Sequence, residues 1–367
     1  MEKVMSRKLI TISTIMTLMS TSVIADVPNV AADIAPIHSL VSRVMDGVGV
    51  PKLIVQSGAS PHGYRLRPSE AKALQDADHV FWVGEELTPW LDSAIDTLAT
   101  KASVTTLLDQ EGIILHDFRE GALFEAHDHS AHGDDDHDDH DDHDDDKGHK
   151  DHDDHDDHDD HKDHDDHDDH DDHKDHDDHV DHDDHDDHKD HDDHDDHGSH
   201  DPHAWLSPEN AKLWLNIIAS KLSVSDPENA ATYFMNAAAG QAEIEAMIAE
   251  VKATLKPVQG GKFVVFHDAY QYFENDFDFY ASGAISLGDS SDPSPARIEK
   301  VQKRIRDEGI QCVLAEPQFK KGLVATVMEG SDATASVIDP LGAELETGPK
   351  LYTRLIKNMA KTLRNCL

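Results

Sequence analysis

Three histidines occur at positions from which their side chains could bind a single metal ion. His62 lies in the segment Gly58–Tyr64 directly after a predicted strand, and His203 stands just before a predicted helix. His267 follows the apolar residues Val264–Phe266, at the end of another predicted strand. Ligands of open α/β sheets gather beyond the carboxyl ends of the strands, so these side chains can face one cleft. Three imidazoles suit Zn²⁺, which favours nitrogen ligands and tetrahedral geometry.

Asp339 is a candidate for the fourth position of such a site. It follows the predicted strand 336–338 and precedes Pro340, and it could bind the metal directly or hold a bound water. Taken singly, each histidine could also be an ordinary loop residue, and only their shared placement favours a site. His38, near the start of a predicted helix, is expected to be structural, and His79, before an apolar strand, is expected on the surface.

Residues 127–200 form a segment with an extreme composition. They hold 24 of the 30 histidines, together with 38 aspartates, 5 lysines and the single bulky apolar residue Val180. A histidine recurs at every third position from His149 to His197, a period that gives neither a helix nor a strand an apolar face. Without apolar surface to bury, we expect this insert to be disordered. Its imidazoles and carboxylates predict loose binding of divalent cations, and a solvated spacer is the alternative.

The net charge of the chain is concentrated in this insert. The whole chain carries −44, of which the insert contributes −38 + 5 = −33, and the remainder therefore carries about −11. Nucleic-acid binding requires clustered lysines and arginines that neutralise phosphates. The composition therefore argues against a nucleic-acid partner.

The N-terminus is typical of an export signal. Lys3, Arg7 and Lys8 precede the apolar stretch Leu9–Ile24, and small residues predict cleavage after Ala25. A membrane anchor is the alternative, but the apolar run is short for one. We therefore expect an exported protein that has lost residues 1–25.

The two cysteines, Cys312 and Cys366, favour a disulfide, because paired cysteines of exported proteins are usually oxidised. A zinc site that uses both thiolates together with other ligands is the alternative.

Strands and helices alternate on both sides of the insert, which predicts an α/β fold with parallel sheets. The predicted strands are 27–34, 53–55, 80–83, 262–266, 311–314 and 336–338. The predicted helices are 36–45, 68–76, 90–98, 207–222, 226–255, 297–308, 322–330 and 351–363. The helix that begins near Asp226 is long enough, at about 45 Å, to connect two lobes. We therefore expect an N-terminal lobe of residues 26–225 that contains the insert, a connecting helix of residues 226–256, and a C-terminal lobe of residues 257–367.

Several of these segments together resemble one protein family. They are Gly58–Tyr64, Leu66–Ser69, Val83–Leu87, Asp201–Pro208, Phe266–Tyr270, Glu316–Phe319 and Asp339–Gly342. The sequence resembles the ZnuA-type, cluster A-I solute-binding proteins, which capture zinc in the periplasm for ABC importers. The resemblance covers essentially all of residues 27–367. It implies two α/β lobes joined by one long rigid helix, a histidine-rich loop at the position of the insert, and a Cys312–Cys366 disulfide.

The resemblance also implies a ligand set and partners. It gives ligand roles to His62, His203 and His267, and it implies a monomer that delivers Zn²⁺ to an inner-membrane permease with its ATPase subunit. Members that favour manganese have Glu at the position of His267, so this histidine favours zinc. Some zinc-binding members have Glu before the first histidine, but Pro61 stands there in this chain. The fourth ligand is therefore expected to be Asp339 or water.

Three other functions are compatible with these residues. A periplasmic zinc buffer or metal chaperone would need the same metal site, and a manganese-binding relative would need a similar one. A hydrolytic zinc enzyme would also need a general base and a substrate pocket, and the sequence offers no sign of either. We therefore do not expect an enzyme.

Overall fold

The computed structural model describes residues 27–119, 123–124, 200–286, 288, 293–318 and 321–367. The predicted signal peptide 1–25 and, apart from His200, the histidine-rich insert 127–200 lie outside the described residues.

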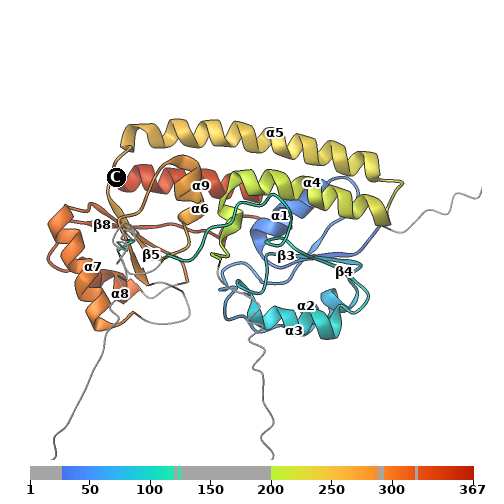
Figure 1. Ribbon diagram of the computed structural model, residues 1–367, viewed down its shortest axis with the longest axis horizontal. Helices are drawn as coiled ribbons and strands as arrows, with labels where there is room; N and C mark the ends of the chain where they lie inside the picture. Colours follow the sequence, from blue (N-terminus) through green and yellow to red (C-terminus); the bar gives the residue numbers. More distant parts are fainter. Residues whose placement is uncertain (1–26, 120–122, 125–199, 287, 289–292, 319–320) are drawn as a thin grey trace, which may run out of the picture. The chain divides into compact units, whose positions relative to one another are not determined.

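A four-stranded parallel sheet forms the centre of the first lobe (Figure 1). Its strands are β1 (Val30–Ala32), β2 (Lys52–Leu53), β3 (His79–Trp82) and β4 (Ser103–Thr106), in the spatial order β2-β1-β3-β4. The helices that connect them are α1 (Ala35–Val44), α2 (Pro68–Gln75) and α3 (Pro89–Leu98). Each helix has a proline within its first two residues, where a missing N–H loses no helical hydrogen bond.

A second four-stranded parallel sheet forms the centre of the other lobe. Its strands are β5 (Phe263–His267), β6 (Ala284–Ser286), β7 (Cys312–Ala315) and β8 (Thr334–Val337), in the order β6-β5-β7-β8. Its helices are α6 (Gln271–Phe277), α7 (Pro295–Glu308), α8 (Lys321–Met328) and α9 (Leu351–Cys366). The prediction of two α/β lobes with parallel sheets is therefore confirmed. The structure adds β4, β6 and α6, which the sequence analysis did not predict.

The long helix α5 (Ala230–Leu255) contacts both lobes, and α4 (Pro208–Ser225) precedes it (Figure 1). At 26 residues, α5 is about 39 Å long. It packs against α1 and α4 of the first lobe and against α9 of the second. The connecting helix is confirmed, although it begins at Ala230 and not at Asp226. The buried carboxylate of Asp226 instead accepts a hydrogen bond from the Tyr233 hydroxyl at 2.7 Å.

The two lobes share one hydrophobic core and several polar contacts. The indole N–H of Trp205 donates to the carbonyl of Pro340 at 2.8 Å, and the Tyr352 hydroxyl donates to the carbonyl of Trp205 at 2.9 Å. From α1, the Ser39 hydroxyl donates to the Gly348 carbonyl at 2.7 Å. These buried contacts fix the boundary at which ligands from the two lobes must meet.

The prediction of a disulfide is confirmed, and the prediction that His79 lies on the surface is wrong. The Cys312–Cys366 disulfide is present and fastens the end of α9 to β7. His79, which was expected on the surface, is instead a buried residue of β3. Its Nε2 atom lies 2.7 Å from the Ser225 hydroxyl of α4, so packing between the sheet and that helix covers it.

Among the residues that the structure describes, no helix combines the length and the apolar character needed to cross a bilayer.

The packing of the first lobe can be tested through Asp33, which directly follows β1. It is fully buried, and its carboxylate accepts hydrogen bonds from the N–H groups of Ile34 and Val83, both at 2.7 Å. Burial raises the pKa of Asp33 to about 7, although these two donors favour the ionised form. Between its ordinary pKa of 3.8 and 7, the folded chain therefore binds one proton more than the unfolded chain.

We therefore predict that Asp33 makes the free energy of unfolding fall as pH rises from 5 to 7, by up to about 1.4 kcal/mol per pH unit. The Asp33→Asn variant should lack this contribution, because its side chain does not titrate. Urea unfolding at several pH values measures the free energy of unfolding of both proteins. The contributions of all other titrating groups cancel in the difference between the two values. Parallel stability curves for the wild type and the variant would contradict the prediction.

Candidate metal centre

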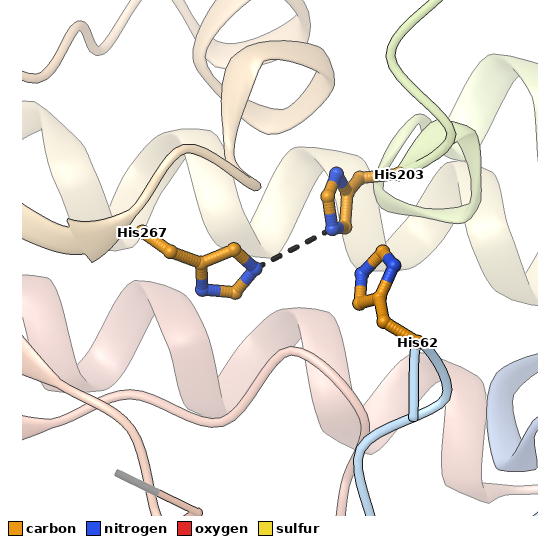
Figure 2. Close-up of side chains that lie close together, drawn as sticks. All are labelled: His62, His203 and His267. Atoms are coloured by element: carbon orange, nitrogen blue, oxygen red, sulfur yellow. Dashed lines mark hydrogen bonds between the residues drawn. The ribbon is translucent and has the colours of Figure 1, made fainter. Parts of the chain in front are cut away.

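Imidazole nitrogens from three distant segments converge on one point (Figure 2). One ring nitrogen from each of His62, His203 and His267 lies within 4.8 Å of the other two. The Nε2 atoms of His203 and His267 are 3.4 Å apart, and the His62 ring centroid lies 5.6 Å from that of His203. Such a separation allows one ion between the rings to contact all three nitrogens, since Zn–N bonds are about 2.0–2.1 Å long.

Each histidine is positioned by a different local structure. His267 is the last residue of β5, and His203 directly precedes the short 3-10 turn η2 (Ala204–Leu206) that leads into α4. His62 lies in the loop between β2 and α2. The structure thus brings together the three residues that the sequence analysis singled out. His203 and His267 are buried, and His62 is half-buried.

Two buried carboxylates stand behind two of the imidazoles. Asp201 Oδ1 lies 2.6 Å from His203 Nδ1, and Glu316 Oε1 lies 2.5 Å from His267 Nδ1. A carboxylate accepts the Nδ1 proton, so each Nε2 presents its lone pair to the shared point. The Gln318 amide donates to the other oxygen of Glu316 at 2.8 Å.

These two carboxylates had no role in the sequence analysis. Asp201 stands two residues before His203, and its proximity was the available signal. Glu316 follows β7, which is the neighbour of β5, and only this strand pairing brings it to His267.

The loop that carries His62 is fastened from two sides. The Trp90 indole of α3 donates to the Pro61 carbonyl at 2.6 Å, and the Tyr64 hydroxyl donates to Glu70 of α2 at 2.7 Å. The rings of Tyr64 and Trp90 also pack against each other, with centroids 5.6 Å apart. A loop without regular structure therefore holds its histidine through hydrogen bonds to the two flanking helices.

Asp339, which was predicted to bind the metal or to hold a water, accepts hydrogen bonds within its own loop. Its two oxygens accept hydrogen bonds from the N–H groups of Leu341, Gly342 and Ala343, at 3.0, 2.9 and 2.6 Å. The ligand group found among the described residues contains the three histidines and no carboxylate. The interpretation of Asp339 as a direct fourth ligand therefore finds no support in this geometry, because the turn after β8 occupies its carboxylate.

The cavity between the histidines is small and largely apolar. It measures about 10 Å³ and is lined by Pro61, His62, His203, Trp205, His267, Gln318, Pro340 and Leu341. A volume of this size holds about one water-sized sphere. The cavity can therefore hold one ion, and it leaves no room for an organic ligand.

Comparison with known proteins identifies the family. The family model described as "ZnuA: Zinc-uptake complex component A periplasmic" matches residues 30–366. The chain belongs to this family. The family resemblance predicted from the sequence motifs is therefore confirmed.

Relatives and solved structures agree with this membership. The chain is 46% identical over 338 residues to the "High-affinity zinc uptake system protein ZnuA" of Brucella abortus (strain 2308), covering 92% of this chain and 91% of the relative. The protein of the same name from Paracoccus denitrificans is 42% identical, with 94% and 93% covered. A solved structure titled "Crystal structure of ZnuA" superposes with a TM-score of 0.63 at 19% identity, covering 93% of this chain and 99% of the other, which shows a shared fold.

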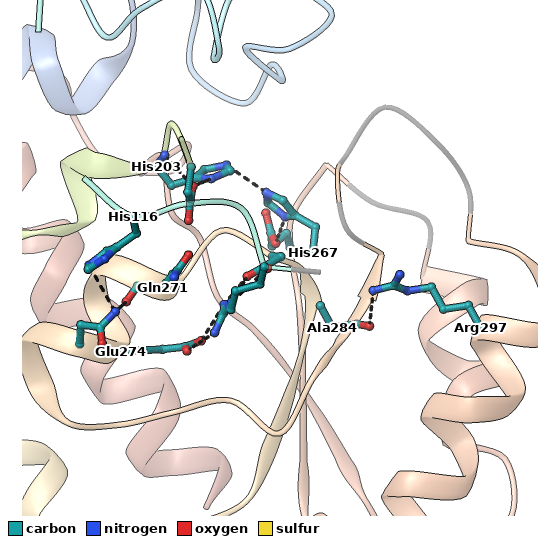
Figure 3. A network of polar contacts seen from close by, with 12 residues as sticks. His116, His203, His267, Gln271, Glu274, Ala284 and Arg297 are labelled. Atoms are coloured by element: carbon teal, nitrogen blue, oxygen red, sulfur yellow. Dashed lines mark hydrogen bonds and ion pairs between the residues drawn. The ribbon is translucent and has the colours of Figure 1, made fainter. Parts of the chain in front are cut away.

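Half-buried Arg119 of the first lobe pairs with two carboxylates of the segment that runs from His267 to Glu274, two residues labelled in Figure 3. Arg119 pairs with Asp268, the residue after His267, and its Nη1 lies 2.6 Å from Glu274 of α6. Burial raises the pKa of both carboxyl groups, and the charge of Arg119 opposes that shift. Phe124 covers the outer side of the guanidinium at 3.6 Å. Sequence reasoning missed Arg119, because nothing near it in the sequence indicates that its partners lie about 150 positions away.

We predict that Arg119→Met destabilises the chain by about 3–5 kcal/mol, because it leaves two buried carboxylates without their counter-charge. Urea unfolding of the full-length protein measures this effect. The matched control is Lys72→Met, which removes an exposed ion pair with Asp76 on α2 and should change stability by less than about 1 kcal/mol. Similar small losses in both variants would contradict the prediction.

Proposed function

We propose that this chain captures Zn²⁺ as the solute-binding subunit of an ABC-type zinc uptake system and delivers it to an inner-membrane permease driven by an ATPase subunit. The observation that carries the proposal is the convergence of three imidazole nitrogens within 4.8 Å of one another. The names of relatives that are 46% and 42% identical over nearly their full lengths support it.

We assign the metal to His62, His203 and His267 and leave the fourth coordination position to water. Asp339 keeps its role in shaping the loop that lines the cavity. A donor set made of neutral imidazoles suits Zn²⁺, whereas Mn²⁺ favours carboxylate and water oxygens. This chemistry favours zinc over the manganese-binding alternative.

The remaining parts of the proposal concern regions and partners outside the described site. The protein acts as a periplasmic monomer after cleavage behind Ala25, and the histidine-rich insert 127–200 raises the local zinc concentration. Its lobes are residues 26–225 and 257–367, joined by residues 226–256. Transport without catalysis is supported by a cavity of about 10 Å³, which has no room for a substrate beside the ion.

The site assignment is tested by titrating the full-length protein with Zn²⁺ in competition with a chromophoric chelator. The wild type should bind one ion tightly, in addition to weaker binding by the insert. Combined replacement of His62, His203 and His267 by Ala should abolish the tight ion and leave the weaker binding unchanged. His116→Ala serves as the control, because it removes an imidazole outside the group.

Two results would reject the proposal. Retention of the tight ion by the triple variant would show that the three histidines do not form the site. Displacement of bound Zn²⁺ by a comparable concentration of Mn²⁺ would show that the metal was wrongly assigned. Delivery to a permease requires in addition that a deletion strain grows poorly under zinc limitation, because a buffer without a permease would not support uptake.

The carboxylate behind His267 should affect affinity without binding the metal. We predict that Glu316→Gln weakens Zn²⁺ binding by about 10- to 100-fold, because the neutral amide is a poorer acceptor for the Nδ1 proton. The same chelator competition measures the loss. The exposed Glu346→Gln variant on the same lobe is the control and should bind as the wild type does. An unchanged affinity in Glu316→Gln would show that the carboxylate does not support the ligand.

A further inference from the structure

The six-residue segment from His267 to Tyr272 contacts Asp201 across the boundary between the lobes. Asp201 is the carboxylate that pairs with His203. The Tyr272 hydroxyl, at the start of α6, donates to the Asp201 carbonyl at 2.8 Å and accepts from the His116 N–H at 3.1 Å. The Asp201 N–H donates to the His116 carbonyl at 2.7 Å. The buried Tyr272 therefore fixes the backbone of Asp201, although the two residues belong to different lobes.

The neighbouring Gln271, which is labelled in Figure 3, contacts the Asp201 side chain. In the orientation that satisfies its neighbours, the Gln271 amide nitrogen donates to Asp201 Oδ2 and to the Asp117 carbonyl, both at 3.2 Å. The other carboxylate oxygen, Oδ1, accepts from the backbone N–H of His203 at 3.0 Å and pairs with its Nδ1 at 2.6 Å. The Asp201 carboxylate thus links Gln271 of one lobe to His203 of the other.

We propose that Gln271 and Tyr272 are positioning residues for the metal ligand His203, acting through Asp201. The inference rests on the proposed zinc site and adds a constraint to it. A rotated Asp201 carboxylate would lose the angle at which it accepts the Nδ1 proton, and the His203 ring would no longer be fixed. The segment that supplies His267 as one ligand therefore also orients a second.

This arrangement makes the two imidazoles depend on one another. Movement of α6 away from the first lobe would withdraw Gln271 and Tyr272 from Asp201 and carry His267 away from His203 at the same time. Separation of the lobes would then remove one ligand and loosen another, so release of the ion would need only a small displacement.

The test compares Gln271→Ala and Tyr272→Phe with wild type in the full-length protein. Each variant should bind Zn²⁺ about 10-fold more weakly in chelator competition. Proton NMR of the metal-free protein supplies the second readout, because a buried imidazole proton shared with a carboxylate is shielded from exchange and resonates far downfield. Exposed histidines of the insert exchange with water and should not contribute. The His203 Nδ1 proton, assigned by its loss in Asp201→Asn, should shift or broaden in both variants, while that of His267 stays in place.

The control is Asn275→Ala on the same helix. Asn275 Nδ2 lies 3.3 Å from the His116 ring and donates to the Gln271 carbonyl at 2.8 Å, but no hydrogen bond joins it to Asp201 among the described residues. Its removal therefore weakens the same inter-lobe junction and leaves the partners of the Asp201 carboxylate in place. This variant should keep both the affinity and the His203 signal of wild type.

An unchanged resonance of the His203 Nδ1 proton in Gln271→Ala and Tyr272→Phe would overturn the inference, whether or not the affinity for Zn²⁺ falls. The two residues of α6 would then affect only the overall stability of the protein. Loss of the signal in Asn275→Ala to the same extent would overturn it as well. The NMR readout needs no metal, so it decides the positioning role even if the wild type fails to bind zinc tightly, a result that would reject the proposed function alone.

Discussion

The central constraint on this molecule is that imidazole nitrogens with lone pairs, which come from different lobes, must face one another at 3.4 Å. Two such acceptors gain nothing from their own proximity, so the surrounding structure must hold them there. Asp201 and Glu316 do so by fixing a proton on the far side of each ring. Both carboxylates are buried, which strengthens these hydrogen bonds and restricts the rings to one orientation. The hydrogen bonds therefore restrict the orientation of both donor rings.

The boundary between the lobes is consequently part of the site. His203 belongs to the segment that enters α4, and His267 ends β5 of the other sheet, so their distance depends on how the sheets are held. The shared core along α5 and the pairing of half-buried Arg119 with the buried Asp268 and Glu274 hold that boundary. An opening motion would have to break these contacts together. The contacts that bring His203 and His267 together are therefore the same contacts that oppose separation of the lobes.

The carboxylates around the cavity all have other partners. Asp201 and Glu316 accept from imidazoles, Asp268 pairs with Arg119, and Asp339 accepts from backbone N–H groups. The group of described residues that could hold a metal ion therefore offers imidazole nitrogens and no carboxylate. This distribution of partners, and not a shortage of acidic residues nearby, leaves a set of nitrogen donors, which is the donor type that Zn²⁺ favours.

The sequence by itself determined the two parallel-sheet lobes, the long helix and the disulfide, and it singled out the three histidines that the structure brings together. Apolar periodicity, prolines at helix starts and strand-end placement are local signals. Sequence analysis missed β4 and β6, whose short runs carry little apolar pattern, and it placed His79 on the surface although α4 covers it. Only the tertiary structure shows that the Asp339 carboxylate accepts hydrogen bonds from N–H groups of its own loop. Only the tertiary structure, likewise, shows that Glu316 contacts His267 and that Arg119 pairs with the residue after it. The positions of Glu316 and Arg119 depend on pairings between segments about 50 to 150 residues apart, such as β5 with β7 and Arg119 with α6. Local sequence carries no record of such pairings, because they arise only when the sheets form and the lobes pack together.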